Sequence, residues 1–212
     1  MSGTDGTQSV ALSAHALHLW RGENHLLRGV SFALSAGELL QVTGPNGVGK
    51  TSLLRVVAGL MPAESGDVFW RGINIYRYAP GYHHDLAYLG HANALKTDLT
   101  AVENLHFTGA MKHTLPHDAY VNVLQQLNIP QCAALPVKAL SAGQRRRVAL
   151  ARVLLSDALL WILDEPITNL DAAGIELVEQ LMANQLLRGG MVLTAAHQPL
   201  LASHPGTRHL CL

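Results

Sequence analysis

One segment of the chain, GPNGVGKT at residues 44–51, limits the possible folds more than any other. It fits the pattern G-x-x-x-x-G-K-[ST], in which glycines let the backbone curl between a strand and the helix that follows. An apolar strand-like run precedes the segment, and TSLLRVVAGL (51–60) follows it with leucines and valines at helical spacing. The segment therefore predicts a strand–loop–helix unit of an α/β domain.

The other apolar segments are consistent with this class. VSFALSAGELLQVTG (30–44) indicates two strands joined by a tight turn, and LLWILDEP (159–166) and GMVLTAAH (190–197) indicate fully buried strands. The stretch between residues 90 and 150 shows helical patterns instead. With 49% apolar residues in 212, the chain can bury a large core, and the alternation favours a mostly parallel sheet.

Charge and hydropathy restrict the partners. Lys plus Arg equals Asp plus Glu at 15 each, which argues against non-specific binding to nucleic acid. The one basic cluster, Arg145-Arg146-Arg147, is interpreted as a solvated helix face. No stretch approaches the ~18 apolar residues of a membrane span, and residues 1–9 lack the features of a secretory signal. We therefore expect a soluble chain that reaches a membrane only through a partner.

The glycine-rich loop predicts a phosphate site, because its N–H groups and the start of the next helix both favour anions. Lys50 supplies a positive charge for the β- and γ-phosphates, and the Thr51 hydroxyl suits Mg²⁺. The segment thus predicts binding of ATP or GTP. The candidate nucleotide-binding residues of this loop are Gly44, Pro45, Asn46, Gly47, Val48, Gly49, Lys50, Thr51 and Ser52.

Two carboxylates follow the buried strand of LLWILDEP. Asp164 is expected at the carboxyl edge of the sheet, where it can hold Mg²⁺ directly or through water. Glu165 is positioned to orient or deprotonate an attacking water. A nucleotide kinase would not need this second carboxylate. The alternative is that the two are surface acids after a strand.

A second anion site is indicated in KALSAGQRRRVALARVLL (138–155), where Ser141 and Gly143 stand at the start of a helix. Because the chain already has one phosphate cradle, the second site requires a second phosphate. Two copies facing head to tail would let each serine site close over the partner's ATP.

These motifs together resemble the ATP-binding cassette (ABC) ATPases, whose signature LSGGQ appears here as LSAGQ (140–144). The resemblance implies that Asp171 in TNLD and His197 in TAAHQ contribute to the site, with His197 sensing the γ-phosphate beside the catalytic residues Lys50 and Glu165. It implies a homodimer that closes on ATP, antiparallel N-terminal strands and an inserted helical lobe. The expected division is a flexible tail at 1–9, a core lobe at 10–89 and 156–212, and a helical signature lobe at 90–155.

Two further residues depend on the resemblance. An aromatic residue commonly stacks on adenine in the family, and Trp20 is the nearest candidate, although a half-buried strand tryptophan is an equally good interpretation. His91 stands where the family usually carries a glutamine that contacts Mg²⁺ or its water. An imidazole can accept a hydrogen bond from such a water but is a poorer direct ligand. The alternative is a histidine that only caps or packs in its loop.

YLGH (88–91), with LKTDLTAVENLHF after it, resembles one branch, the ATP-binding subunits of the cytochrome c biogenesis system. That resemblance implies integral membrane permease partners, a place at the cytoplasmic face of the inner membrane, and either haem export or release of a haem-loaded chaperone. Alternatives are the ATPase of another small-molecule transporter or a soluble ABC ATPase. That last class usually has two cassettes in one chain or long coiled-coil insertions, which do not fit a chain of 212 residues with zero net charge.

Overall fold

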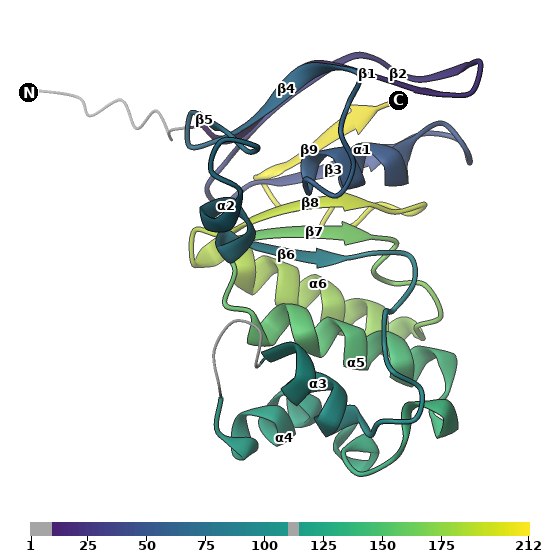
Figure 1. Ribbon diagram of the computed structural model, residues 1–212. Helices are drawn as coiled ribbons and strands as arrows, with labels where there is room; N and C mark the ends of the chain where they lie inside the picture. Colours follow the sequence, from purple (N-terminus) through teal and green to yellow (C-terminus); the bar gives the residue numbers. More distant parts are fainter. Residues whose placement is uncertain (1–9, 110–114) are drawn as a thin grey trace, which may run out of the picture.

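A computed structural model describes residues 10–109 and 115–212, in which two β-sheets are stacked with helices between and beneath them (Figure 1). The predicted tail at residues 1–9 lies outside the described residues. The upper sheet is antiparallel with the order β2-β1-β4-β5. Its strands are β1 (Val10–Arg21), β2 (Asn24–Ser35), β4 (Ser65–Trp70) and β5 (Ile73–Asn74).

The lower sheet is wholly parallel, with the order β6-β7-β8-β3-β9. Its strands are β3 (Leu39–Thr43), β6 (Leu86–Leu89), β7 (Leu160–Asp164), β8 (Met191–Ala195) and β9 (Thr207–Cys211). β7 and β8 are buried along their whole length, as the continuous apolar runs predicted. The carboxyl ends of β3, β7 and β8 meet at one edge, where ligands bind in open parallel sheets.

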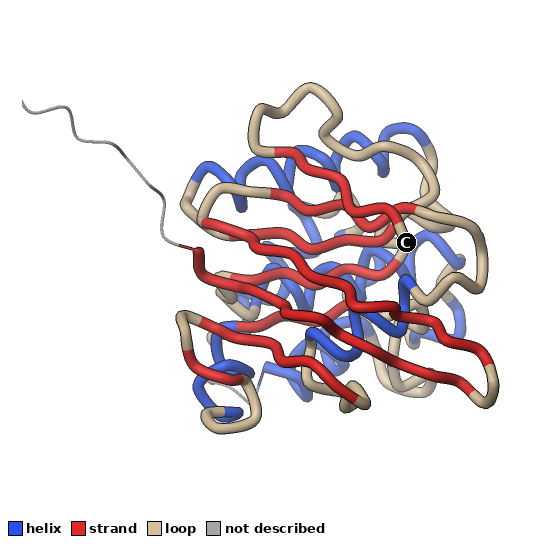
Figure 2. The backbone as a smooth tube through the Cα atoms, turned by 90° about the horizontal axis from the view of Figure 1, so that it is seen from above, coloured by secondary structure: helices blue, strands red, loops and turns tan. Residues whose placement is uncertain are grey.

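Helices cover both faces of the parallel sheet. α1 (Lys50–Val57) lies between the two sheets, whereas α5 (Ala142–Leu155) and α6 (Ala172–Leu187) cover the opposite face (Figure 1). Residues of β7 alternate between the two cores: Leu160 and Ile162 face α1, and Trp161 and Leu163 face α5 and α6. Seen from the antiparallel side, the strands lie in front and most helices behind (Figure 2). Because side chains alternate along a strand, β7 contributes residues to both cores.

The remaining helices are short. α2 (Ala79–Asp85) precedes β6, and α3 (Ala101–Gly109) and α4 (His117–Gln126) pack against α5. Two 3₁₀ turns, η1 (Pro130–Cys132) and η2 (Val137–Ala139), connect α4 to α5. The predicted α/β class, with a parallel sheet and antiparallel N-terminal strands, is confirmed. The lobe boundaries at residues 89 and 155 stay a prediction.

Candidate functional site

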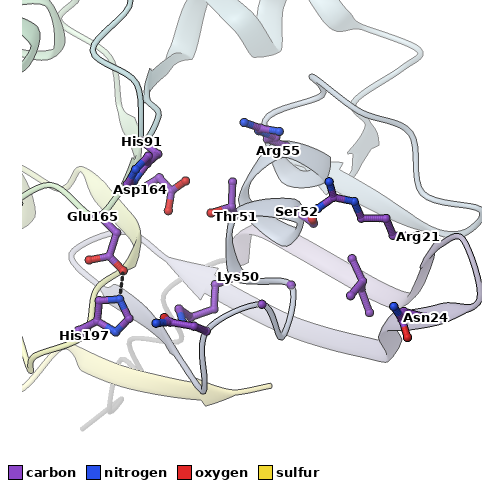
Figure 3. A pocket seen from close by; sticks show the side chains of 14 residues that line it. Arg21, Asn24, Lys50, Thr51, Ser52, Arg55, His91, Asp164, Glu165 and His197 are labelled. Carbon is purple, nitrogen blue, oxygen red and sulfur yellow. Dashed lines mark ion pairs between the residues drawn. The ribbon is translucent and has the colours of Figure 1, made fainter.

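A cavity of about 750 Å³ opens at the carboxyl ends of β3, β7 and β8 (Figure 3). One end is lined by side chains that follow these strands or β6. They are Lys50, Thr51, His91, Asp164, Glu165 and His197. The other end is lined by Arg21, Asn24 and Leu26 of the β1–β2 hairpin. Asn46, Gly47, Gly49 and Ser52 also line the cavity, whereas Gly44, Pro45 and Val48 shape the loop without lining it. Six of the nine predicted residues of the glycine-rich loop thus come together in one cavity with His91, Asp164, Glu165 and His197.

The loop after β3 adopts a conformation that requires glycine. Gly47 and Gly49 have φ angles of 80° and 117°, in a region that other residues rarely adopt. Gly49 is the N-cap of α1, and no side chain caps this helix. The first N–H groups of a helix have no partner within it, so those of α1 are available to an anion in the cavity.

Lys50 is buried at the start of α1. Its Nζ donates hydrogen bonds to the carbonyl oxygens of Gly44 at 2.8 Å and Pro45 at 3.0 Å. These bonds hold the ammonium group over the loop, where a triphosphate in the cradle would meet it. The position agrees with the charge-supplying role that the motif predicts.

Asp164 ends β7 and is 1% exposed. Its Oδ2 is buried and has no hydrogen-bond partner among the described residues. A buried carboxylate oxygen without a partner is costly unless a cation or donor meets it. Together with the Thr51 hydroxyl in the same cavity, this oxygen fits Mg²⁺, which takes one or two protein oxygens and completes its shell with phosphate and water. No cluster of three or more metal-ligating side chains occurs among residues 10–109 and 115–212, as expected for such a sparse site.

Glu165 follows Asp164 in a strained backbone conformation. Its φ of 51° lies in the left-handed region, which costs a non-glycine residue about 1–3 kcal/mol. Its N–H donates to the Ala195 carbonyl at 2.8 Å, tying it to the end of β8. Its Oε1 lies 3.4 Å from Nε2 of His197, while the His197 ring is 62% exposed to the cavity side (Figure 3). The pair has the arrangement of a base with an orienting histidine.

His91 follows β6 after Gly90 and lines the cavity beside Asp164 and Glu165 (Figure 3). The structure thus places this histidine near the candidate Mg²⁺ residues.

The hairpin end of the cavity does not contain Trp20. Its ring is 48% exposed and stacks on His25, with ring centroids 4.1 Å apart. The neighbouring Arg21 lines the cavity instead, and no Phe, Tyr or Trp is among its described lining residues. The structure thus does not place Trp20 in the lining of this cavity. We missed Arg21 because neighbouring residues of a strand point to opposite faces, and the sequence did not reveal which faced the loop.

The signature residues lie outside the cavity. Ser141 caps α5: its Oγ accepts from the N–H of Gln144 at 3.1 Å, and the Gln144 side chain accepts from the N–H of Ser141 at 2.8 Å. Gly143 lies so close to the TNLD loop that an added Cβ would stand 2.7 Å from the Asn169 carbonyl oxygen. Asp171, the N-cap of α6, is exposed. None of Ser141, Gly143 and Asp171 reaches the cavity of its own chain.

The interpretation of Arg145-Arg146-Arg147 as a solvated face is wrong for Arg146. This side chain is 2% exposed and donates five hydrogen bonds, all to loops at the carboxyl ends of β6 and β7. Arg147 is mostly buried too and forms an ion pair with Asp171 at 2.8 Å. The sequence-based interpretation failed because burial of these arginines depends on how α5 packs against the edge of the sheet, and the residue type alone does not reveal that packing.

Comparison with known proteins agrees with this geometry. The profile of the family described as ABC transporter matches residues 27–168. The chain belongs to the ABC transporter family. Among curated relatives of this ABC ATPase, the cytochrome c biogenesis ATP-binding export protein CcmA of Nitrosomonas europaea is 43% identical over 202 residues, 95% of each chain. CcmA 2 of Cupriavidus metallidurans is 46% identical over 190 residues, 89% of this chain and 90% of that one.

Solved structures of low identity share the fold of this ABC ATPase. An ATP-binding subunit of an ABC transporter matches with a TM-score of 0.79 and 24% identity, over 93% of this chain and 87% of that one. A dimeric ATP-binding cassette in a post-hydrolysis state, bound to ADP and Pi, matches with a TM-score of 0.78 and 22% identity, over 88% of each chain. Among the described residues of the present chain, no helix is long and apolar enough to cross a bilayer.

Proposed function

We propose that this ABC ATPase hydrolyses ATP to drive a membrane transporter that serves cytochrome c biogenesis. The observation that carries the ATPase part is one cavity that combines the glycine-rich cradle with Asp164 and the Glu165–His197 pair. The identity of 43–46% to proteins named for cytochrome c biogenesis supports the biological role.

In the proposed reaction, the oxygen of a water attacks the γ-phosphorus and the bond from that phosphorus to the β–γ bridging oxygen breaks. The water proton passes to the Glu165 carboxylate, and ADP and phosphate leave. His197, 3.4 Å from Oε1 of Glu165, holds the carboxylate in place and faces the γ-phosphate. Lys50 balances the charge on the β- and γ-phosphates.

Thr51 and Asp164 would hold Mg²⁺, which supplies charge neutralisation to the phosphate oxygens when bound. His91 would accept a hydrogen bond from the hydration shell of that ion, in place of the glutamine usual in the family. The unpaired Oδ2 of Asp164 supports this assignment.

Arg21 is proposed as the contact for the nucleotide base. With the phosphates in the cradle, the base must extend toward the β1–β2 hairpin, where Arg21, Asn24 and Leu26 line the cavity. A planar guanidinium group stacks on aromatic rings, so it can take the place of an aromatic platform.

Two copies of the chain would complete the site. Ser141, Gly143 and Asp171 lie outside their own cavity, exposed or near the surface, so they are placed to meet the ATP of a second copy. The relative bound to ADP and Pi is described as dimeric, which supports a homodimer here.

The remaining partners follow from the relatives. The word export in their names supports integral membrane permease subunits, so we propose attachment at the cytoplasmic face of the inner membrane. The indirect cargo would be haem or a haem-loaded chaperone.

The test is purification of the tagged chain from membranes of its host, followed by ATPase assay and identification of co-purifying proteins. Wild-type activity that is absent from a Glu165→Gln complex, together with small multi-spanning proteins of cytochrome c biogenesis, is the expected result. Different permease partners would overturn the biological role and leave the ATPase standing. Absence of any membrane partner would favour a soluble ATPase.

A further inference from the structure

Arg146 connects two segments that carry residues of the proposed reaction, the one after β6 and the one at the end of β7. Its Nη2 donates to the carbonyl oxygens of Asp164 at 2.6 Å and Glu165 at 2.7 Å, and its Nε donates to that of Pro166 at 3.2 Å. Its Nη1 donates to the carbonyl oxygen of Gly90 at 2.9 Å. One guanidinium group from α5 thus holds the ends of both β6 and β7.

The bond to Glu165 acts on a strained residue. Glu165 has a φ of 51°, and in this conformation its Oε1 lies 3.4 Å from Nε2 of His197. Three bonds hold its peptide groups: the N–H donates to the Ala195 carbonyl, and the carbonyl accepts from Nη2 of Arg146 and from the N–H of Thr168. Removal of the guanidinium group takes away one of these three restraints, the only one from a side chain, and also the bonds to the neighbouring carbonyls of Asp164 and Pro166.

The bonds of Nη1 act on the loop that carries His91. Gly90 directly precedes His91, and the side-chain oxygen of Asn93 accepts a second bond from Nη1 at 2.9 Å. His91, Asp164 and Glu165 lie next to one another at the phosphate end of the cavity (Figure 3). Arg146 therefore restrains both the loop that carries His91 and the segment that carries Asp164 and Glu165.

The guanidinium group stays charged in this position. Burial lowers the pKa of Arg146 to about 10, while the nearby charges of Asp164 and Glu165 oppose that effect. At neutral pH the group is protonated and all five of its bonds are made to oxygen acceptors. A lysine would keep the charge, but its single nitrogen cannot span the β6 and β7 sides together.

We propose that Arg146 is a positioning residue for ATP hydrolysis. Its hydrogen bonds fix the backbone of Glu165 and the loop that carries His91 relative to each other. It is not among the residues that line the cavity. The inference rests on the proposed ATPase function. It predicts that loss of the guanidinium fork damages turnover much more than nucleotide binding, because the cradle at Gly47–Lys50 does not depend on it.

The experiment compares Arg146→Lys with Arg152→Lys in the complex purified from membranes. Arg152 is a matched control: it is on the same helix, is partly buried, and donates through Nη1 to the carbonyls of Asn93 and Ala94 without reaching β7. We expect kcat to fall about 10- to 100-fold in Arg146→Lys, as for a misplaced catalytic group. KM for ATP and Kd for a non-hydrolysable ATP analogue should stay within about threefold, and Arg152→Lys should keep kcat within the same range.

Wild-type kcat in Arg146→Lys overturns the inference. So does a parallel loss of kcat, nucleotide affinity and thermal stability in both lysine variants, because that describes a merely structural role. If Arg146→Lys fails to fold, Asn93→Ala decides: it removes one acceptor, and an unchanged kcat overturns the inference, whereas a severalfold fall with unchanged KM supports it. Absence of hydrolysis by the wild-type complex contradicts the proposed function itself, and the inference falls with it.

Discussion

Two helices of this chain begin beside a proposed phosphate, and they begin differently. α1 starts at Gly49 with no side chain over its first turn, inside the cavity of its own chain. α5 starts at Ser141, where a capping box with Gln144 satisfies an N–H at each end of the box, on a surface outside the cavity. The difference fits the two proposed roles: α1 would bind phosphate with its uncapped N–H groups, whereas α5 is capped within its own chain and would meet a phosphate only from a second copy.

The largest expected effect concerns Glu165, which lines the same cavity as the start of α1. Glu165→Gln keeps the shape of the side chain and removes the base, so kcat should fall about 100- to 10,000-fold. ATP binding should remain and a closed dimer should accumulate, which gel filtration with ATP would detect. Glu176→Gln, at an exposed position of α6, is the control. A fully active, monomeric Glu165→Gln protein would refute the assignment.

Lys50→Ala tests whether the cradle binds phosphate. Loss of the buried ammonium group removes charged hydrogen bonds to the nucleotide, and an affinity loss of about 100-fold, or about 2.8 kcal/mol, is expected. Equilibrium binding of a fluorescent ATP analogue would measure it. Lys138→Ala, at an exposed ion pair with Asp98, should bind normally. Unchanged ATP affinity in Lys50→Ala would contradict the proposal that the start of α1 binds phosphate.

Ser141→Asp separates capping from phosphate binding at α5. Aspartate caps helices as well as serine does, so the free energy of unfolding should change by less than about 0.5 kcal/mol. Its negative charge would repel the phosphate of the partner copy, and kcat should fall at least about tenfold. Denaturant unfolding and ATPase assays measure the two effects. Normal turnover with a retained cap would show that α5 meets no phosphate.

The smallest expected effect concerns the hairpin end of the cavity. Arg21→Ala should lower ATP affinity about 3- to 10-fold, the range of a cation–π contact, and leave affinity for inorganic tripolyphosphate unchanged. Trp20→Ala, one residue away, should alter neither. If Trp20→Ala weakens ATP binding and Arg21→Ala does not, the sequence-based prediction of Trp20 as the base contact is right after all.

The local motifs could be predicted because each requires a particular residue at a particular place. The turn after β3 requires glycines at positive φ, and continuous apolar runs such as those of β7 and β8 require a sheet buried on both faces. The order of strand, cradle and helix then follows from chain connectivity. In the same way, Asp164 had to end a buried strand, and the structure has it there.

Trp20 and Arg146 could not be placed from sequence, for two physical reasons. The β1–β2 pairing shifts register between Leu19 and Trp20, and a one-residue shift exchanges the faces of a strand. Arg146 belongs to a basic run that suggests a solvated face, but α5 packs against the ends of β6 and β7, where five carbonyl and amide oxygens compensate the burial of this side chain. A basic run does not reveal acceptors that lie 18 to 56 residues away.

The sequence by itself determined the fold class, the conformation of the glycine-rich loop and the buried strand that ends at Asp164, because these depend on local backbone geometry and on hydrophobic period. Only the tertiary structure decided which side chains share the cavity. It placed Arg21 in the cavity lining and Trp20 outside it, left Ser141 and Asp171 outside, and brought Arg146 within hydrogen-bond distance of Gly90 and Glu165. Those choices depend on long-range packing and strand register, which no single segment encodes.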